Sequence, residues 1–367
     1  MSGRFFIVLL GLCFLISCTQ GTTAAPTPSP TETAVPLPTL TLQPAPTETA
    51  GVQTLRQLAE KKHIQIGTYL NGQWFPDPQW QEIAAREFNL AVITSGFYWE
   101  YMEAQRGQFD FSFVEEQVAF AKSNNMSMVG HALLLAQSPY IPDWLAQGNF
   151  SKDELSQILR DFIAGVMDHY KGRIGTYLVV EDAPLLPQEM KRDVFYKQFG
   201  YDYIDLAFRI ARETDPSAML IYNAGDNETA RSPASKLTHQ IVERLQSEGL
   251  IDGVGFEMHL DANKAPSKAD VMAEMKSYGL PVHVTEIDVD LSHLSGTKQE
   301  RYTKQAQVYS DMLSACVESG VCRSFSLWGF GDKYSWLRRH SSTADPTPFD
   351  DDLNPKPAYF ALLDALR

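Results

Sequence analysis

Cysteine is scarce in this chain of 367 residues, which has only four. Two of them, Cys13 and Cys18, lie near the N-terminus, so that Cys316 and Cys322 are left for the part that folds. Their spacing is too wide for a C-x-x-C redox motif, and there is no second pair with which to build a zinc site. Because the chain begins with an export signal, as argued below, this even pair favours a local structural disulfide.

Basic stripes and glycine-rich phosphate loops are also missing. The formal net charge is −14, from 31 basic and 45 acidic residues. This charge argues against nucleic acid or an acidic polymer as partner and favours a neutral one. Without a glycine-rich phosphate loop, a doubly wound nucleotide-binding sheet is disfavoured.

Residues 1–18 have the form of a bacterial lipoprotein signal peptide. Arg4 precedes the apolar run 5–16, and residues 15–18, Leu-Ile-Ser-Cys, resemble a lipobox. That resemblance implies cleavage before Cys18, lipidation of Cys18, and no membrane attachment other than this anchor. An ordinary secretory signal or an uncleaved anchor is the alternative. Either reading predicts an exported protein, as a cell-surface lipoprotein or in secreted form.

Residues 19–51 are composed mainly of Thr, Pro, Ala and Ser with almost no aromatic side chains. Such a segment is too poor in apolar side chains to fold. It predicts a disordered linker, stiffened by proline, that holds a domain away from a surface.

Residues 52–367 predict a single α/β domain, a (β/α)8 TIM barrel. Their length falls within the roughly 200 to 400 residues of such barrels. Short apolar runs alternate with helical patterns, one of which opens with a capping box at Ser151 and Glu154. The apolar runs are 64–69, 90–94, 126–133, 177–180, 219–222, 254–258, 282–285 and 324–328. Eight strands alternating with helices favour a closed parallel barrel.

The residues that finish these strands would meet at one mouth, where this architecture keeps its chemistry. They are mostly acids, imidazoles and an amide, together with one tryptophan: His131, Glu181, Asp182, Tyr222, Asn223, Glu257, His259, Glu286, Asp288 and Trp328. Opposed carboxylates with an aromatic platform are the parts needed to cleave a glycosidic bond. The aromatic ring accepts the C–H face of a sugar. This chemistry requires neither a metal nor an organic cofactor.

The motifs around these residues resemble glycoside hydrolase family 10, the endo-β-1,4-xylanase family. The strongest are 285–288 (Thr-Glu-Ile-Asp), 257–260 (Glu-Met-His-Leu, against Gln-x-His-Leu in the family), 327–329 (Leu-Trp-Gly) and 332–336 (Asp-Lys-Tyr-Ser-Trp). Further similar segments are 130–131, Trp99 with 107–111, 222–223 and 355–359. The pair Cys316 and Cys322 stands just before the eighth strand, as in many members.

The resemblance implies a role for each residue. Glu286 would be the nucleophile of a retaining mechanism, and His259 would orient it with Asp288 and Tyr222 behind. The substrate, a polysaccharide or oligosaccharide, would be bound by His131, Asn223, Glu257, His259, Trp328, Trp336 and Trp99. We expect the protein to act as a monomer.

The largest departure from the family falls on the fourth strand, where its Trp-Asp-Val-Val-Asn-Glu-Ala reads Tyr-Leu-Val-Val-Glu-Asp-Ala at 177–183. Asp182 takes the acid/base position and is shorter by roughly 1.5 Å. The gap to Glu286 would then be about 6.5 to 7 Å, at the lower edge of the inverting range. Three outcomes are open: Asp182 acts as acid/base, Glu181 takes the role, or the site is slow, inverting or inactive. Glu181 also replaces an Asn that would donate to the sugar's 2-hydroxyl.

The second and third strands also lack family contacts on the glycone side of the cleft. Asn-Glu-Met-Lys-Trp becomes Ser-Gly-Phe-Tyr-Trp at 95–99, and Trp-His becomes Leu-Ala at 135–136. Tyr98, Tyr101 and Trp99 could supply replacement stacking or ordinary packing. We expect hydrolysis of internal β-1,4 bonds in xylan or a related β-glycan. The alternative is a carbohydrate-binding surface lipoprotein with an impaired barrel. A cytosolic metabolic barrel enzyme fits the signal and linker poorly.

Overall fold

The structure, a computed structural model, describes residues 53–70, 77–137 and 139–367. The predicted signal peptide, the lipidation site Cys18 and the linker 19–51 therefore lie outside the described residues. No helix in the described part of the chain combines the length and apolar character needed to cross a membrane.

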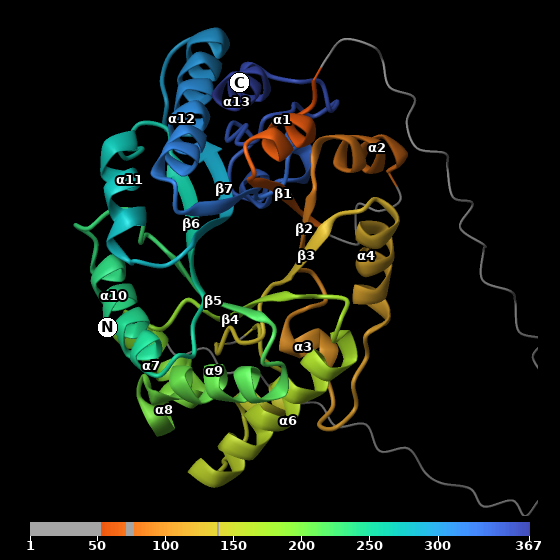
Figure 1. Cartoon of the computed structure of the whole chain (residues 1–367), viewed down its shortest axis with the longest axis vertical. Coiled ribbons are helices and arrows are strands. Elements are labelled where there is room, and N and C mark those ends of the chain that lie inside the picture. Colours follow the sequence, from red (N-terminus) through yellow and green to blue (C-terminus); the bar gives the residue numbers. More distant parts are fainter. Residues whose placement is uncertain (1–52, 71–76, 138) are drawn as a thin grey trace, which may run out of the picture. The chain divides into compact units, whose positions relative to one another are not determined.

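Eight parallel strands close into one barrel in chain order, each pairing with the next and β8 with β1 (Figure 1). The strands are β1 (Gln65–Leu70), β2 (Leu90–Ile93), β3 (Ser127–Gly130), β4 (Thr176–Glu181), β5 (Met219–Gly225), β6 (Gly253–Asp261), β7 (Val282–Asp290) and β8 (Cys322–Leu327). Each of the eight predicted apolar runs overlaps one of these strands. The predicted eight-stranded parallel barrel is therefore confirmed.

Helices surround the strands (Figure 1). They are α1 (Leu55–Lys61), α2 (Pro78–Glu87), α3 (Trp99–Met102), α4 (Ser112–Ser123), α5 (Asp143–Ala146), α6 (Lys152–Tyr170), α7 (Pro187–Arg192), α8 (Val194–Phe199), α9 (Asp202–Thr214), α10 (Pro233–Ser247), α11 (Lys268–Ser277), α12 (Lys298–Ser319) and α13 (Pro357–Ala365), with the 3-10 turns η1 (Asp332–Tyr334) and η2 (Trp336–Arg339). The predicted capping box is present at the start of α6, where Ser151 and Glu154 bond each other's backbone N–H groups.

The core has two parts, which follow from the alternation of side chains along a strand. A small cluster contains Leu90, Val129, Ala132, Leu178 and Ile221. The neighbours of these residues along β4 and β5 belong instead to the large cluster that packs the strands against the helices. Alternate side chains therefore fill the barrel interior and leave the mouth to the polar residues at the strand ends.

One extra residue occurs in each of the two strands that end in candidate acids. In β4, Leu178 pairs with Ile221 and Val180 with Tyr222, so Val179 has no counterpart in β5. In β7, Thr285 is the extra residue between the pairs that Val284 and Glu286 form with β6. Bulges of this kind re-aim the side chains that follow them. Here they set the direction of the acids at both strand ends.

One disulfide and one buried ion pair hold the chain together around β8. Cys316 of α12 and Cys322 of β8 form a disulfide with Cα atoms 5.0 Å apart. Behind the loop that follows β8, Nζ of Lys356 lies 2.9 Å from Oδ2 of Asp332, and both side chains are buried. This pair anchors the segment that presents Trp336 to the mouth.

Candidate active site

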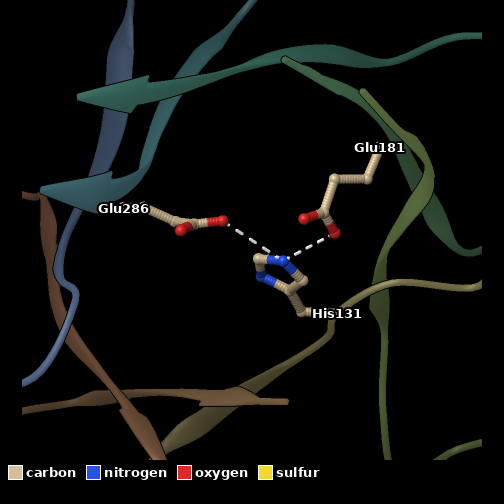
Figure 2. A group of neighbouring side chains, drawn as sticks. All are labelled: His131, Glu181 and Glu286. Carbon is tan, nitrogen blue, oxygen red and sulfur yellow. Dashed lines mark ion pairs between the residues drawn. The ribbon is translucent and has the colours of Figure 1, made fainter. Parts of the chain in front are cut away.

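Glu286, on β7, holds its carboxylate between two histidines, His131 and His259, of which Figure 2 draws His131. The side chain is buried. Oε2 lies 3.0 Å from Nε2 of His259, and Oε1 lies 3.2 Å from Nε2 of His131. Each oxygen therefore has its own imidazole, and the carboxylate is fixed from two directions.

His259, on β6, contacts carboxylates through both ring nitrogens. Nδ1 is 3.0 Å from Oδ1 of Asp288, and Nε2 is 3.0 Å from Oε2 of Glu286. A neutral imidazole carries one N–H, so only the imidazolium can donate to both acids. Burial disfavours that charge, but the carboxylates of Asp288 and Glu286 outweigh it and hold the pKa of His259 well above its usual value.

His131 follows β3 and places one nitrogen between two acids (Figure 2). Its Nε2 is 2.7 Å from Oε2 of Glu181 and 3.2 Å from Oε1 of Glu286. One N–H between two oxygens points straight at neither, so these contacts are ion pairs without hydrogen-bond geometry. Burial lowers the pKa of His131, but the charges of Glu181 and Glu286 outweigh this effect and the pKa is raised.

The ionisation of Glu286 is set by these neighbours. Burial raises the pKa of its carboxyl group, and the charges of His131 and His259 oppose that rise without cancelling it. The pKa of Glu286 therefore stays above its usual value, and protonated imidazoles at His131 and His259 limit the rise.

Asp182 and Glu181 are adjacent in sequence but differ in exposure. Glu181 is buried and paired with His131, whereas Asp182 is exposed. Asp182 has φ 48°, a left-handed conformation that Asp tolerates better than most residues. Its Oδ1 accepts a hydrogen bond of 3.1 Å from the N–H of Gly225.

The surroundings of Asp182 make its ionised form less favourable than it is in water. Although the carboxyl group faces solvent, the protein around it displaces much of its water, and this raises its pKa. The Gly225 N–H opposes the rise, and the charge of Glu286 adds to it. An accessible acid with a raised pKa has the properties of a general acid.

Glu257 and Asn223 form a buried polar pair beside Asp182. Nδ2 of Asn223 donates to Oε1 of Glu257 at 2.7 Å, and Oδ1 of Asn223 accepts from the hydroxyl of Thr285 at 2.7 Å. Burial, and then the charges of Asp182, Glu286 and Glu181, raise the pKa of Glu257 well above its usual value. Burial and the neighbouring acids therefore disfavour the ionised form of Glu257.

Two tryptophans provide aromatic surface at the mouth. Trp328, directly after β8, is half-buried and lies 5.2 Å from the ring of His131. Trp336 is 37% exposed, and its Nε1 donates to Oδ2 of Asp288 at 2.8 Å. Both rings are thus fixed from behind and keep a face on which a sugar can stack.

Trp99, predicted as a substrate contact, lies instead in the core. It is 2% exposed, its ring stacks on Phe162 of α6 at 4.0 Å, and its Nε1 donates to Glu103 at 2.7 Å. The helix α3 turns this residue away from the mouth, because its apolar face packs on α6. Of the other two candidates for stacking, Tyr101 is 58% exposed and Tyr98 is half-buried with its ring 5.0 Å from that of Tyr140.

Of the remaining predicted residues, Tyr222 and Asn223 are both buried within β5. Sequence reasoning assigned no role to Tyr69 or to Thr285, although Thr285 stands in the motif 285–288. Tyr69 lies 4.6 Å from the ring of Trp328 and supports it, and Thr285 fixes the amide of Asn223. Tyr69 ends the first predicted apolar run, and that position was the available signal.

Carboxylates and imidazoles are also common ligands of divalent cations. Three sets among the described residues have donor atoms within 4.8 Å of one another: His131 with Glu181 and Glu286, Glu257 with His259 and Glu286, and Glu181 with Asp182 and Glu257. In two of these sets an imidazole already contacts a carboxylate. A cation there would have to displace that ion pair.

A (β/α)8 barrel whose mouth holds a buried, histidine-bound carboxylate, a separate accessible acid and exposed tryptophans is a glycoside hydrolase. The sequence profile described as glycosyl hydrolase family 10 matches residues 54–365, and the chain belongs to that family. The chain is 33% identical over 321 residues to endo-1,4-beta-xylanase B of Thermotoga neapolitana, covering 85% of this chain and 91% of that protein.

Solved structures agree with this assignment. Native xylanase 10B from Thermotoga maritima superposes with a TM-score of 0.80 at 33% identity, covering 86% of this chain and 98% of that one. Xylanase 10B from Thermotoga petrophila in complex with xylobiose gives a TM-score of 0.80 at 32% identity, covering 87% of this chain and 98% of that one.

Proposed function

We propose that this protein hydrolyses internal β-1,4 bonds of xylan or a closely related β-glycan by a retaining mechanism, with Glu286 as nucleophile and Asp182 as acid/base. The observation that carries the proposal is the position of Glu286 between His131 and His259. Two imidazoliums at a buried carboxyl group oppose the rise in its pKa that burial causes and fix its orientation, as a nucleophile requires.

In the first step Glu286 attacks the anomeric carbon while the carboxyl proton of Asp182 passes to the glycosidic oxygen, whose bond to that carbon breaks. The product is a glycosyl-enzyme ester at Glu286 and a free aglycone. The exposure and raised pKa of Asp182 suit it for this proton transfer. Glu181 suits the role less, because its carboxylate is buried against His131.

In the second step Asp182, now a carboxylate, removes a proton from water as the water attacks the anomeric carbon. Glu286 leaves as a carboxylate. The imidazoliums of His131 and His259 stabilise the negative charge that returns to it. Trp328 and Trp336 would hold the sugar faces near this centre.

Azide rescue of single alanine variants tests these roles. For Asp182→Ala acting on an activated aryl xyloside, we expect azide to restore turnover and give the β-glycosyl azide, because the glycosyl-enzyme still forms. For Glu286→Ala we expect the α-glycosyl azide from direct displacement. If Glu181→Ala shows the rescue and Asp182→Ala does not, the acid/base assignment is wrong.

The substrate class rests on relatives and on the site. The solved neighbour in complex with xylobiose shares the fold and 32% of the sequence. The glycone-side departures at 95–99 and 135–136 make the polymer the part of the proposal that most needs testing. Reducing-sugar release from xylan, mixed-linkage glucan and cellulose tests it, with the highest rate expected on xylan.

A second candidate is a sugar-capturing protein with little hydrolysis. It is favoured by the fourth strand, where Glu181 and Asp182 replace the Asn and Glu of the family. Binding of xylooligosaccharides by the wild type, with no release of reducing sugar from any of the three polymers, would establish it in place of the hydrolase.

For the N-terminal part we propose export, lipidation at Cys18 and a linker over residues 19–51 that ties the barrel to the cell surface. Support comes from the apolar run 5–16 and the Leu-Ile-Ser-Cys sequence. Expression of Cys18→Ser in a bacterial host tests the anchor. Wild type should be found in the membrane fraction and carry labelled fatty acid, whereas the variant should lose both properties.

A further inference from the structure

We propose that Glu257 stores a proton for the active site and passes it through Asp182 to the leaving oxygen, so that the two acids work as a pair. This inference rests on the proposed function, because it concerns the protonation step of the same reaction. In the family motif that this segment resembles, the position of Glu257 holds a Gln, which has no proton to give.

Hydrogen bonds fix which oxygen of Glu257 can carry the proton. Oε1 accepts from Nδ2 of Asn223 at 2.7 Å. In this orientation of the amide, its Oδ1 accepts from the hydroxyl of Thr285 at 2.7 Å. Oε1 is thereby engaged as an acceptor, and Oε2 is left as the oxygen that bears hydrogen.

Oε2 of Glu257 lies beside Asp182. A Cβ placed on Gly225 would be 3.4 Å from this atom and 3.8 Å from Oδ1 of Asp182. Oxygens of Glu257, Asp182 and Glu181 all lie within 4.8 Å of one another. One water molecule can bridge oxygens of Glu257 and Asp182 at such a distance, and rotation of the exposed Asp182 carboxyl group can bring them into direct contact. The absent side chain at Gly225 keeps the space between the two acids open.

The charges around Glu257 favour a retained proton. The titratable neighbours come from four strands or the loops after them: Glu181, Asp182, Asp226, His259 and Glu286. Four of these five are acids. Tyr98 and Tyr222 also face the group and are neutral, since burial raises the pKa of each. Glu257 is buried among them and is the member of the pair that holds hydrogen most firmly.

The proton balance over one turnover is closed. At rest the pair holds one proton, stored on Glu257, and Asp182 is ionised. In the first step the proton on Oε2 of Glu257 passes to Asp182, which delivers that same proton to the glycosidic oxygen, so the pair becomes a dianion. In the second step Asp182 takes a proton from the attacking water and returns it to Glu257. No other co-reactant is needed.

Glu257→Gln tests the proposal, because Gln keeps the oxygen that accepts from Asn223 but cannot store a proton. The two substrates are phenyl β-xylobioside, whose leaving group needs protonation, and 2,4-dinitrophenyl β-xylobioside, whose leaving group does not. For the phenyl substrate we expect the alkaline limb of kcat/KM to move about one pH unit or more to lower pH. The rate on the dinitrophenyl substrate should fall far less.

Asp226→Asn is the matched control. It also removes one acid near Glu257, but from an exposed position outside the pair. We expect a clearly smaller shift. If Glu257→Gln leaves the alkaline limb in place, or if Asp226→Asn moves it as far, the inference is wrong while the proposed function stands. If the wild type hydrolyses neither substrate, both are wrong.

Discussion

Nε2 of His259 lies 3.0 Å from Oε2 of Glu286, and this contact is the last of a series that begins outside the barrel. Nε1 of Trp336 donates to Asp288, Asp288 holds Nδ1 of His259, and His259 donates to Glu286. The exposed ring of Trp336 is thus linked to the proposed nucleophile through Asp288 and His259. Substitutions in this series should act on catalysis more than on folding.

Asp288→Asn should lower kcat by about 10- to 100-fold. Asn can accept from Trp336 or from His259 with its single oxygen, but it cannot serve both, and it does not support the imidazolium. The pKa of His259 should fall, which NMR titration of the ring would show. Asp290→Asn is the control, because Asp290 ends the same strand but its carboxylate accepts from the local turn at Ser292. Equal losses of activity in both variants would contradict the role of Asp288.

The acid limb of the pH profile should report Glu286. The pKa of Glu286 is raised, so kcat/KM should decrease as the pH is lowered. The midpoint of this decrease should lie above pH 4.5, the ordinary pKa of a glutamate. His131→Gln removes one of the cations that oppose this rise, so the limb should move to higher pH. An acid limb that stays in place in His131→Gln would show that another group governs it.

Lys356→Met should destabilise the barrel by about 3–5 kcal/mol, because it leaves the buried carboxylate of Asp332 without its partner. Urea unfolding measures this loss. The double variant Lys356→Met, Asp332→Asn should recover much of it. Lys268→Met, which breaks an exposed pair with Glu318, should cost less than about 1 kcal/mol. Similar losses for the two lysines would refute the argument from burial.

His283 should make the fold sensitive to acid. It is buried on β7, and burial, followed by the charge of Arg323, lowers its pKa from 6.5 to about 4. The imidazole of His283 binds a proton more readily in the unfolded chain than in the folded one. The neutral, buried imidazole therefore contributes its full stability above pH 6.5, and this stability is lost as the pH falls toward 4. The loss is about 3 kcal/mol between pH 7 and pH 4. His283→Gln should show a shallower decrease over this range in urea unfolding, and parallel curves would contradict the assignment.

The sequence predicted the barrel because its signals are local. Eight apolar runs end in polar residues, and a capping box such as Ser151 with Glu154 marks a helix start without any knowledge of tertiary contacts. The pairing of Cys316 with Cys322 was predicted from the count of cysteines together with the expectation that the chain is exported. These features do not depend on how distant strands meet.

The geometry of the site was less accessible from the sequence. The bulges at Val179 and Thr285 depend on register with neighbouring strands, and apolar patterns do not report register. Trp99 matched a family segment, but its burial against Phe162 is a property of helix packing. That His131 lies between Glu181 and Glu286 follows from three strands meeting at one mouth, which no local pattern contains.

The most direct test of the account is to trap the covalent intermediate. Incubation with 2,4-dinitrophenyl 2-deoxy-2-fluoro-β-xylobioside should release one equivalent of dinitrophenol and leave the sugar attached to the protein, since the fluorine slows both steps while the leaving group speeds the first. Peptide mass spectrometry should then find the modification on Glu286. A modification on Glu181, or hydrolysis of xylan that gives the inverted anomer as first product with no adduct formed, would contradict the proposed mechanism.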